Sequence, residues 1–598
     1  MFVSANTGFA SEADALAISR NIQTRHLPFG TILDPVFSAT DSSQIVAYTR
    51  CGDSAIWTGH YLAAEAFRYK VTGSQDALAN VKTAITGIKT LSDVTGYNLL
   101  ARCLVPLSSP YAQSIMMEER HNGIYINSAA QELWAGNTSR DQYSGVFFGL
   151  AVAYDMVDDA GVRSSIKDEV TLLLDYLRGH NWSPTMPNGS ISTTFLIRPD
   201  QELSFLQVGR HVNPDHYSAF GYDIDKITLA AGVITPIAVE VTDNNSYFKF
   251  NLDYINLYDL IRLEGSGSFR NIYNGAYSVL RNHTKDQQNA FFNMIDRALN
   301  GPYAARDAET VSMLDAWLQR PKRDVPVDLR GKLPSCNTPD EACSPVPVSL
   351  RPTTDFLWQR NPYMLAGAGS GTTESAGIDY ILPYWMARLY GVVSANAIVS
   401  AASGSGVVST ESIVSFYGLN LASATVSATT VLLPATLGGV SVQVKDSTGA
   451  ARLAPLFYVS GTQINFEIPP GTAAGQASFT IVDAGNATLA SGTGNVSAIA
   501  PALFTADGTG KGVAAALVTP AYLSLYGTGI RNRSSLANVS VTIQGTSAPV
   551  LFAGAQGGYV GLDQVNVTVP LSLRGSGETD LVLTVDGQTA NTVRVNIQ

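Results

Sequence analysis

The sequence predicts a multidomain protein in which an all-α domain, an α/α toroid of helical hairpins, is followed by two all-β sandwiches. Apolar residues recur at helical spacing over most of residues 40–390, in consecutive segments joined by short turns. After residue 394, short period-2 segments separated by turn residues replace them. The β part also repeats itself at a spacing near 100 residues. These observations divide the chain into residues 1–393, 394–497 and 498–598.

The helical pattern begins with two hairpins. Residues 53–71 and 76–94 are separated only by a turn at Thr72-Gly73, so the two helices must pack side by side. Residues 141–157 and 162–177 repeat this arrangement. Further helical stretches cover roughly residues 223–239, 246–263, 269–281, 286–299, 307–319 and 378–390. An irregular helical bundle is the alternative to a toroid.

Two of the predicted helices begin alike, with Trp57-Thr58-Gly59-His60-Tyr61 in one and Tyr143-Ser144-Gly145-Val146-Phe147 in the other. A glycine inside a helix costs about 1 kcal/mol relative to alanine. Its recurrence therefore predicts close contacts between helices of an inner ring. In a toroid, the loops that enter the inner helices line a central funnel, where we expect the site.

The cysteines predict two disulfides. Cys336 and Cys343 lie in the Pro-rich loop LPSCNTPDEACSPVPV and are expected to pair, and Cys51 and Cys103 could form a second bridge. Disulfides are typical of oxidising compartments, which favours an extracellular or cell-surface protein. Residues 1–10 lack the basic and apolar regions of a signal peptide. No Cys or His spacing resembles a zinc site, so no metal or cofactor is predicted.

Composition excludes several classes of protein. Charged residues make up only 15% of the chain, against about 25% in typical soluble domains, which excludes disordered and coiled-coil proteins. The net charge of -11 argues against a nucleic-acid partner. No apolar run reaches the roughly 18 residues that a membrane span needs. No pattern indicates an oligomeric state.

Chemistry is expected in residues 1–393. All 7 His, 6 Trp, 4 Cys and 9 Met residues lie there, whereas the 205 residues from 394 on carry 9 acidic and 7 basic side chains. Catalysis usually needs His, Cys, a metal cluster or paired carboxylates.

The β part consists of alternating apolar and polar segments such as VSVQV at residues 440–444. It also contains an internal repeat. Tyr417-Gly418 recurs as Tyr526-Gly527, and Gln463-Ile464-Asn465 recurs as Gln564-Val565-Asn566. The runs IVSFYGLNL, APLFYVSGTQINFEIPPGTAAG, PALFTADGTGKGVAAAL and AGAQGGYVGLDQVNVTVP resemble the duplicated C-terminal module of acidobacterial secreted proteins, which is similar to Ig-like IPT/TIG domains. The resemblance implies two Ig-like sandwiches and export. A spacer or stabilising role is expected for them, with carbohydrate or protein binding as the alternative.

The first candidate cluster covers residues 139–143. Asp141 would be a general base or nucleophile, with a pKa lowered by Arg140 and by the helix N-terminus. Arg140 would hold a substrate carboxylate, and Tyr143 could be a base. For Asp141, and for Asp53 as a substrate contact, capping of the following helix is the alternative.

Two polar loops would supply the partners of Asp141. Their candidate acids, bases and substrate contacts are Glu119, His121, His211, Asp215, His216 and Asp223. The three carboxylates are the candidate partner acids, His216 is a candidate base, and His121 and His211 would contact substrate. Pro214 predicts that the second cluster lies in a loop. Plain solvated turns are the alternative for both segments, and a metal site, without a specific ligand pattern, is a further alternative for the second.

Four more residues complete the predicted substrate site: Trp57, Trp358, Arg360 and Glu374. Indole rings could stack on the C–H faces of sugars, although core packing explains such residues equally well.

Residues 40–393 resemble, at the level of the fold alone, six-hairpin glycosidases and polysaccharide lyases, so no catalytic residues carry over. The resemblance implies a secreted enzyme that acts on an oligo- or polysaccharide. A glycoside hydrolase with two Asp or Glu side chains is preferred. The alternatives are a lyase with a Tyr or His base on a uronate, and a non-catalytic surface protein that binds a glycan or a partner.

Overall fold

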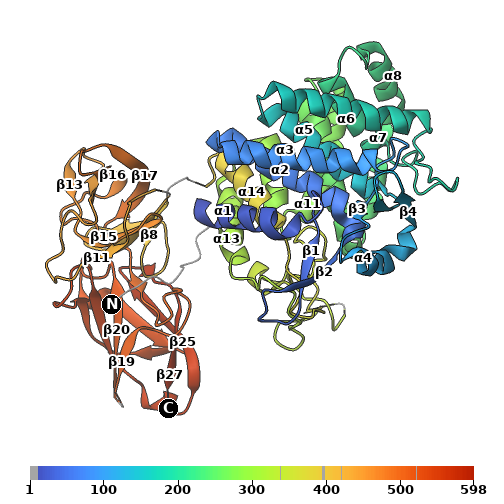
Figure 1. Cartoon of the computed structure of the whole chain (residues 1–598). Helices are drawn as coiled ribbons and strands as arrows, with labels where there is room; N and C mark the ends of the chain where they lie inside the picture. Colours follow the sequence, from blue (N-terminus) through green and yellow to red (C-terminus); the bar gives the residue numbers. More distant parts are fainter. Residues whose placement is uncertain (1–10, 337, 394–396, 419, 520, 598) are drawn as a thin grey trace. The chain divides into compact units, whose positions relative to one another are not determined.

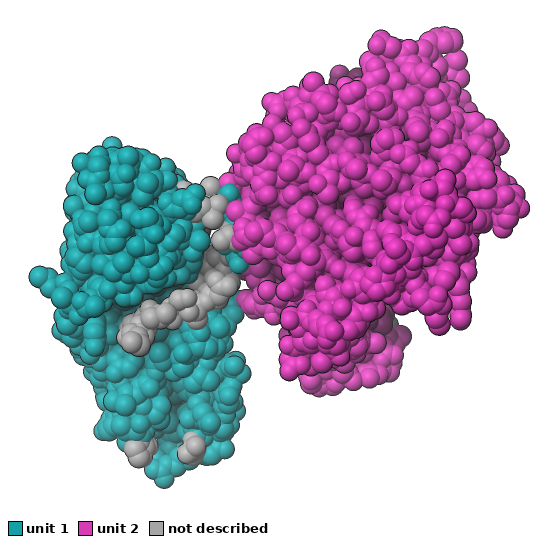
Figure 2. All heavy atoms as spheres, in the orientation of Figure 1, with its two compact units in different colours: residues 1–14, 394–598 teal, residues 15–393 magenta. Residues whose placement is uncertain are grey.

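The computed structural model describes residues 11–336, 338–393, 397–418, 420–519 and 521–597. The chain divides into two compact units, residues 15–393 and residues 394–598 together with 1–14 (Figure 2). Residues 15–393 are helical with small sheets, and the described residues from 397 on form an all-β region (Figure 1). The prediction of a multidomain chain with a helical region followed by a β region is confirmed at this level.

Most of the helices alternate between central and covering positions. The central ones are α2 (Ser54–Thr72), α5 (Arg140–Met156), α7 (Pro199–Val212), α10 (Tyr247–Leu263), α12 (Ala290–Asn300) and α14 (Ile378–Leu389). The others are α1 (Glu12–Asn21), α3 (Gln75–Asp93), α4 (Ala112–Glu118), α6 (Ala160–Gly179), α8 (Ala219–Leu229), α9 (Ile234–Glu240), α11 (Ser268–Thr284) and α13 (Ala304–Trp317). Side-chain caps start several of them, such as Ser74 at α3 and Asp159 at α6.

The central helices contact one another in a closed cycle. Helix α2 packs on α5, α5 on α7, α7 on α10, α10 on α12, α12 on α14 and α14 on α2. Five of them also pack against the helix that follows in the chain: α3, α6, α8, α11 and α13. Figure 1 shows α2 and α3 lying side by side as the first of these pairs. We call the six central helices the helix cycle.

Aromatic side chains fill the middle of the helix cycle. Trp57 and His60 of α2 contact Trp358 of a later loop, with ring centroids 6.2 and 5.2 Å away, and Phe291 of α12 closes the group. His60 also reaches Asn251 of α10, across the cycle, at 3.4 Å. Burial lowers the pKa of His60 to about 4, so its ring is neutral at pH 7. These rings, which we call the aromatic centre, fill the middle of the helix cycle, and the expected funnel at its rim stays a prediction.

Glycines bring α2 and α5 into backbone contact. A Cβ atom on Gly59 would lie 1.9 Å from the carbonyl oxygen of Gly145, and one on Gly149 would lie 2.3 Å from that of Gly59. The expectation that the recurrent glycines mark a close helix contact is confirmed. Because the two helices touch near their first turns, their N-terminal ends lie together.

Several parts of the helical unit differ from the sequence analysis. Strands β3 (Cys103–Pro106), β4 (Ile124–Asn127) and β5 (Glu132–Ala135) form an unpredicted sheet, and β1 (Asp34–Phe37) pairs with β2 (Ile45–Thr49). Helix α7 was also not predicted, because its buried face is polar and includes Gln201, Glu202 and Gln207. The stretch at residues 223–239 is divided between α8 and α9.

The β unit consists of two halves, each with two sheets around one core. The first half comprises β8 (Ala397–Ser400), β9 (Val407–Ser409), β10 (Ile413–Tyr417), β11 (Val426–Ser427), β12 (Val440–Lys445), β13 (Ala451–Leu453), β14 (Leu456–Val459), β15 (Gln463–Glu467), β16 (Gly475–Asp483) and β17 (Thr488–Ser497). Its sheets have the orders β11-β14-β15-β10-β8 and β13-β12-β16-β17-β9. Residues of both sheets, such as Phe466 and Phe479, share its core. We call it the first sandwich.

The second sandwich comprises β18 (Ala502–Leu503), β19 (Ala516–Val518), β20 (Tyr522–Thr528), β21 (Val539–Ile543), β22 (Thr546–Ala548), β23 (Val550–Ala555), β24 (Asp563–Thr568), β25 (Gly577–Val585), β26 (Gln588–Thr589) and β27 (Val593–Ile597). One sheet has the order β18-β20-β24-β23 with β19 beside β20, and the other β22-β21-β25-β26 with β27 beside β25. Residues of both sheets, such as Val565 and Leu583, share its core. No strand in the described part of the chain belongs to both sandwiches.

The internal repeat of the sequence occupies matching places in the two sandwiches. Tyr417 pairs with Gln463 across β10 and β15, and Tyr526 pairs with Gln564 across β20 and β24. The two copies therefore share their strand register. Whether the sandwiches are Ig-like stays a prediction.

Candidate functional site

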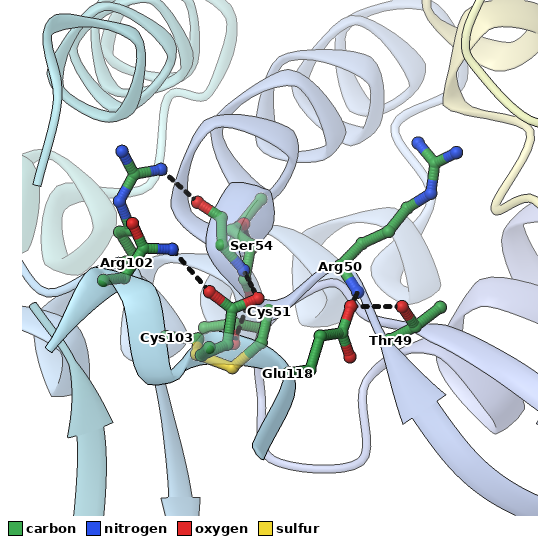
Figure 3. The surroundings of a disulfide bond; sticks show 12 residues. Thr49, Arg50, Cys51, Ser54, Arg102, Cys103 and Glu118 are labelled. Atoms are coloured by element: carbon green, nitrogen blue, oxygen red, sulfur yellow. Dashed lines mark hydrogen bonds between the residues drawn. A yellow bond between two sulfur atoms is a disulfide. The ribbon is translucent and has the colours of Figure 1, made fainter. Parts of the chain in front are cut away.

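Three segments of the helical unit converge where α2 begins. The Cys51–Cys103 disulfide joins the residues before α2 to β3. Arg102 donates hydrogen bonds to the carbonyl oxygen of Gly52 at 2.6 Å and to that of Asn137, shortly before α5, at 3.0 Å. Figure 3 shows the disulfide at the start of α2, with Arg102 and Arg50 on either side of it.

Two carboxylates lie at this convergence. Asp53 directly precedes α2, and Asp141 stands in the first turn of α5. The Oδ1 atom of Asp53 is 4.0 Å from Nη1 of Arg102. Burial raises the pKa of Asp53, Arg102 opposes this, and the charge of Asp141 raises it further. The two side chains are thus electrostatic neighbours, and we call them the carboxylate pair.

The pKa of Asp141 corrects a prediction. Arg102, Arg140 and Arg198 do lower it, but burial has the larger effect, so the pKa lies above its ordinary value. The helix start and Arg140 alone suggested the opposite shift. Asp53 accepts no capping hydrogen bond from α2, although its position is that of a cap.

Arg140 connects the pair to a second, buried group of charges. It is half-buried, and burial and Arg198 lower its pKa. Arg198 donates to both carboxylate oxygens of Asp200, at 2.9 and 2.7 Å, and also forms ion pairs with Glu240 and Asp253. Asp253 is fully buried and its pKa lies well above the ordinary value, because burial disfavours its charge. Arg140 therefore lies between Asp141 on one side and the mixed-charge group around Arg198 on the other.

Glu119 is brought to this region but cannot serve as the partner acid. It is 3% exposed, and its two carboxylate oxygens accept hydrogen bonds from the Gly52 amide at 2.7 Å and the Asn122 side chain at 2.6 Å. It orders the loop before Asp53. His121 is exposed on the same turn, where its Nδ1 lies 3.1 Å from the Glu118 carbonyl oxygen.

The His-rich cluster lies elsewhere. His211 stands in the last turn of α7 rather than in a loop, which is a correction, and pairs with Asp155 near the end of α5 at 2.6 Å. Asp141 and Asp155 are separated by about 21 Å along the helix, at roughly 1.5 Å per residue. His216 pairs with Asp175 on α6.

The two remaining candidate acids of that cluster are not buried. Asp223 forms an ion pair with Lys226 on α8 at 3.2 Å, and Asp215 is exposed in the turn after α7. Neither is brought into contact with the carboxylate pair by any described interaction.

The predicted aromatic contacts are core residues. Trp358 is 0% and Trp57 4% exposed, because both belong to the aromatic centre, so neither can stack on a sugar. Tyr143 is fully buried, and its hydroxyl accepts a hydrogen bond from the Leu100 amide at 3.3 Å. A base role for Tyr143 is therefore wrong. Arg360 is held by Asp355 and by the Ala366 carbonyl oxygen.

Glu374 is a structural residue rather than a substrate contact. It is buried, accepts a hydrogen bond from Asn21 at 2.7 Å and lies 3.5 Å from His26. His26 is itself fully buried, between Glu374 and Asp34. Burial favours the neutral ring, but the two carboxylates outweigh it and raise the pKa of His26, while the same contacts lower the pKa of Glu374 to about 2.

We expect the stability of the helical unit to depend on pH through this group. The contribution of His26 is present below pH 6.5 and is lost as the pH rises through its raised pKa. The contribution of Glu374 is present above pH 4.5 and is lost as the pH falls towards 2. The melting temperature, measured as a function of pH, should therefore be highest between about pH 4.5 and 6.5 and should fall on both sides of this range. The His26→Gln variant should lack the alkaline limb; an unchanged alkaline limb would contradict this reading.

Both disulfides are present, as predicted: Cys51–Cys103 and Cys336–Cys343. They span 52 and 7 residues of sequence, so in the chain-entropy model they stabilise the fold by about 4 and about 2.5 kcal/mol.

We therefore expect the Cys51→Ser/Cys103→Ser variant to lose more unfolding free energy than the Cys336→Ser/Cys343→Ser variant, which serves as its control. Denaturant unfolding of both variants measures the difference. Equal losses would show that loop length does not govern the effect.

A shallow groove of about 560 Å³ lies on another surface of the helical unit. It runs along α6 and includes the exposed ring of Tyr97 and the side chains of Asp168, Asp175 and His180. An exposed aromatic ring beside carboxylates is a surface that can bind a sugar.

Sequence reasoning missed four residues of the candidate site: Arg102, Arg198, Asp200 and Asp253. A signal existed for two of them, Arg198 and Asp200, since Arg198-Pro199-Asp200 stands at the start of α7 much as Arg140-Asp141 stands at the start of α5. Among the described residues, no group of three or more His, Cys, Asp or Glu side chains could hold a metal ion. No described helix is long and apolar enough to cross a membrane.

No sequence-family model matches the chain, and no curated protein is significantly similar to it. Among solved structures, it is similar to the SGBP-B protein of the Bacteroides ovatus mixed-linkage glucan utilization locus, in complex with a mixed-linkage heptasaccharide. The identity is 15% and the TM-score 0.18, and the match covers 32% of this chain and 43% of that one. A score this low does not establish a common fold.

Proposed function

We propose that the helical unit is a glycoside hydrolase and that the carboxylate pair performs its acid–base chemistry. The observation that supports the proposal is the position of Asp53 and Asp141 at the first turns of two adjacent helices of the cycle, both with raised pKa values. Glycoside hydrolysis needs two carboxylic acids, one protonated and one ionised.

The charges around the pair favour different roles for its members. Asp53 is a neighbour of Arg102 and Arg50, but burial and the carboxylates of Asp141 and Glu119 outweigh them and favour its protonated form, which suits a general acid. Asp141 has Arg102, Arg140 and Arg198 as neighbours, which favour the ionised form of a base or nucleophile. Different charged neighbours around two carboxylates are the usual basis of acid–base assignment.

The architecture fits the same proposal. A closed cycle of central helices, five of them paired with the helix that follows, is the arrangement expected of an α/α toroid, and the rim at the helix N-termini is where its loops would receive a substrate. The two disulfides suit an oxidising compartment, so we propose an extracellular or surface-exposed enzyme whose tail consists of two Ig-like sandwiches.

The two alternatives have less support. A lyase would need a Tyr or His base near the pair, but Tyr143 is buried and His211 and His216 pair with other carboxylates. A glycan-binding surface protein would use the groove around Tyr97 instead of the pair.

Product analysis on a panel of polysaccharides tests the proposal. We expect new reducing ends without an unsaturated product. An unsaturated uronate, seen by its ultraviolet absorbance, would indicate a lyase. Binding without product, abolished in the Tyr97→Ala variant, would identify a binding protein, and either result would overturn the hydrolase proposal.

A further inference from the structure

Because β10, β14 and β15 share their register with β20, β23 and β24, each position on these strands of the second sandwich has a counterpart in the first. In the pairing of β10 with β15, Ile413 occupies the place that Tyr522 occupies in the pairing of β20 with β24. Strands β14 and β23 carry a bulge at the same place, which makes Phe457 equivalent to Leu551.

A third equivalence comes from the neighbouring strand. Ser415 of β10 and Ser524 of β20 occupy equivalent positions. Val399 on β8 lies opposite Ser415, and Leu517 on β19 lies opposite Ser524, so Val399 and Leu517 are equivalent too. All three equivalences follow from the hydrogen-bonded pairing of the strands. They do not follow from residue type, because in each case the two equivalent residues are different amino acids.

In the first sandwich this surface is covered. Ile413 and Phe457 pack with Ala502, Phe504 and Leu562 of the second sandwich in one apolar cluster. The Ile413 amide also donates to Oγ1 of Thr528 at 2.8 Å. Ile413 is 7% and Val399 3% exposed. The covered surface is thus the interface of one sandwich with another.

In the second sandwich the equivalent surface is bare. Leu517 is 60%, Tyr522 50% and Leu551 53% exposed, and Phe552 next to Leu551 is exposed too. We call these four residues the apolar patch. Neighbouring exposed apolar side chains of this kind are typical of a protein interface. Two of the four are leucines, so the patch lacks the flat row of rings that stacks on a sugar.

We propose that the apolar patch is the docking surface for a second copy of this chain, with the two patches meeting about a two-fold axis. The covered counterpart shows that this position accepts a β-sandwich, and a second copy supplies one with a matching apolar surface. Self-complementary contacts of this kind are the commonest way in which soluble chains associate. The 205 residues from 394 on contain only 16 charged side chains, so little like-charge repulsion opposes the contact.

Analytical ultracentrifugation of the full chain over a concentration series tests the proposal. We expect a dimer with a dissociation constant in the micromolar range, and at least a 100-fold weaker dimer in the Leu517→Lys/Leu551→Lys variant. The Leu432→Lys variant is the matched control, because Leu432 is an exposed leucine of the first sandwich outside the patch. It should dimerise like the parent chain.

A cysteine cross-link gives a second readout that needs no charge in the patch. All four native cysteines are engaged in disulfides, so an added cysteine is the free thiol that can form an interchain cross-link. Leu517→Cys should form an interchain disulfide on mild oxidation, whereas Leu432→Cys should not. A parent chain that stays monomeric, a patch variant that dimerises normally, or equal cross-linking of the two cysteine variants would overturn the proposal.

Discussion

Replacing Asp141 by Asn is expected to lower turnover on the substrate identified by product analysis by at least about 100-fold. The substitution preserves the size of the side chain and removes the ability to act as base or nucleophile. Because Asn also suits the first residues of a helix, the unfolding free energy should change by less than about 1 kcal/mol. Asp53→Asn should give a loss of similar size, since it removes the proposed acid.

Asp223→Asn is the matched control for both variants. Asp223 is a carboxylate of the same unit that pairs with Lys226 on α8, and nothing in the described structure connects it with the pair. Its turnover should equal that of the parent enzyme. If Asp141→Asn retains turnover but melts at a lower temperature, Asp141 is only part of the helix start and the proposed site is wrong.

A large effect on stability is expected from an alanine at Gly59 or Gly145. The Cβ atom added at Gly59 would lie 1.9 Å from a backbone oxygen of α5, and the one added at Gly145 would lie 2.6 Å from the Ile56 carbonyl oxygen of α2. Backbone cannot rotate away as a side chain can, so the helices would have to separate. We expect a loss of about 3 kcal/mol or more in unfolding free energy, together with reduced turnover as the pair is pulled apart.

Gly275→Ala is the control for a glycine inside a helix. Gly275 is exposed on α11, and an added Cβ atom would meet nothing within 4 Å. Alanine should stabilise the unit there by about 0.5–1 kcal/mol through helix propensity. Denaturant unfolding of the three variants gives the comparison; a mild effect at Gly59 would mean that the α2–α5 contact can relax.

The sequence predicted those features of the fold that leave a local pattern. Gly59 and Gly145 recur in similar helix starts, the cysteines of the Pro-rich loop stand close together in the chain, and the repeated Tyr-Gly and Gln-x-Asn motifs stand at equal strand positions. In each case the residues that matter are neighbours in sequence or repeat each other, so spacing alone carries the information.

The site could be predicted only in part, because its members meet through the tertiary structure. Arg102 reaches Asp53 and the loop before Asp141 only because a disulfide and a small sheet fold its segment back. The direction of the Asp141 pKa shift depends on burial, which the neighbouring Arg140 does not reveal. The sequence predicts that Trp358 stacks on a sugar, but its loop places it in the buried aromatic centre.

The aromatic centre also has a spectroscopic consequence. All 6 tryptophans precede residue 394, and Trp57 and Trp358 are packed together inside the helix cycle. Their fluorescence therefore reports the unfolding of the helical unit, since the sandwiches contain no indole emitter. Circular dichroism sees the backbone of both units. If the two signals give the same melting temperature, the whole chain unfolds in one step. If the circular dichroism signal shows a further transition at higher temperature, the sandwiches are more stable than the helical unit.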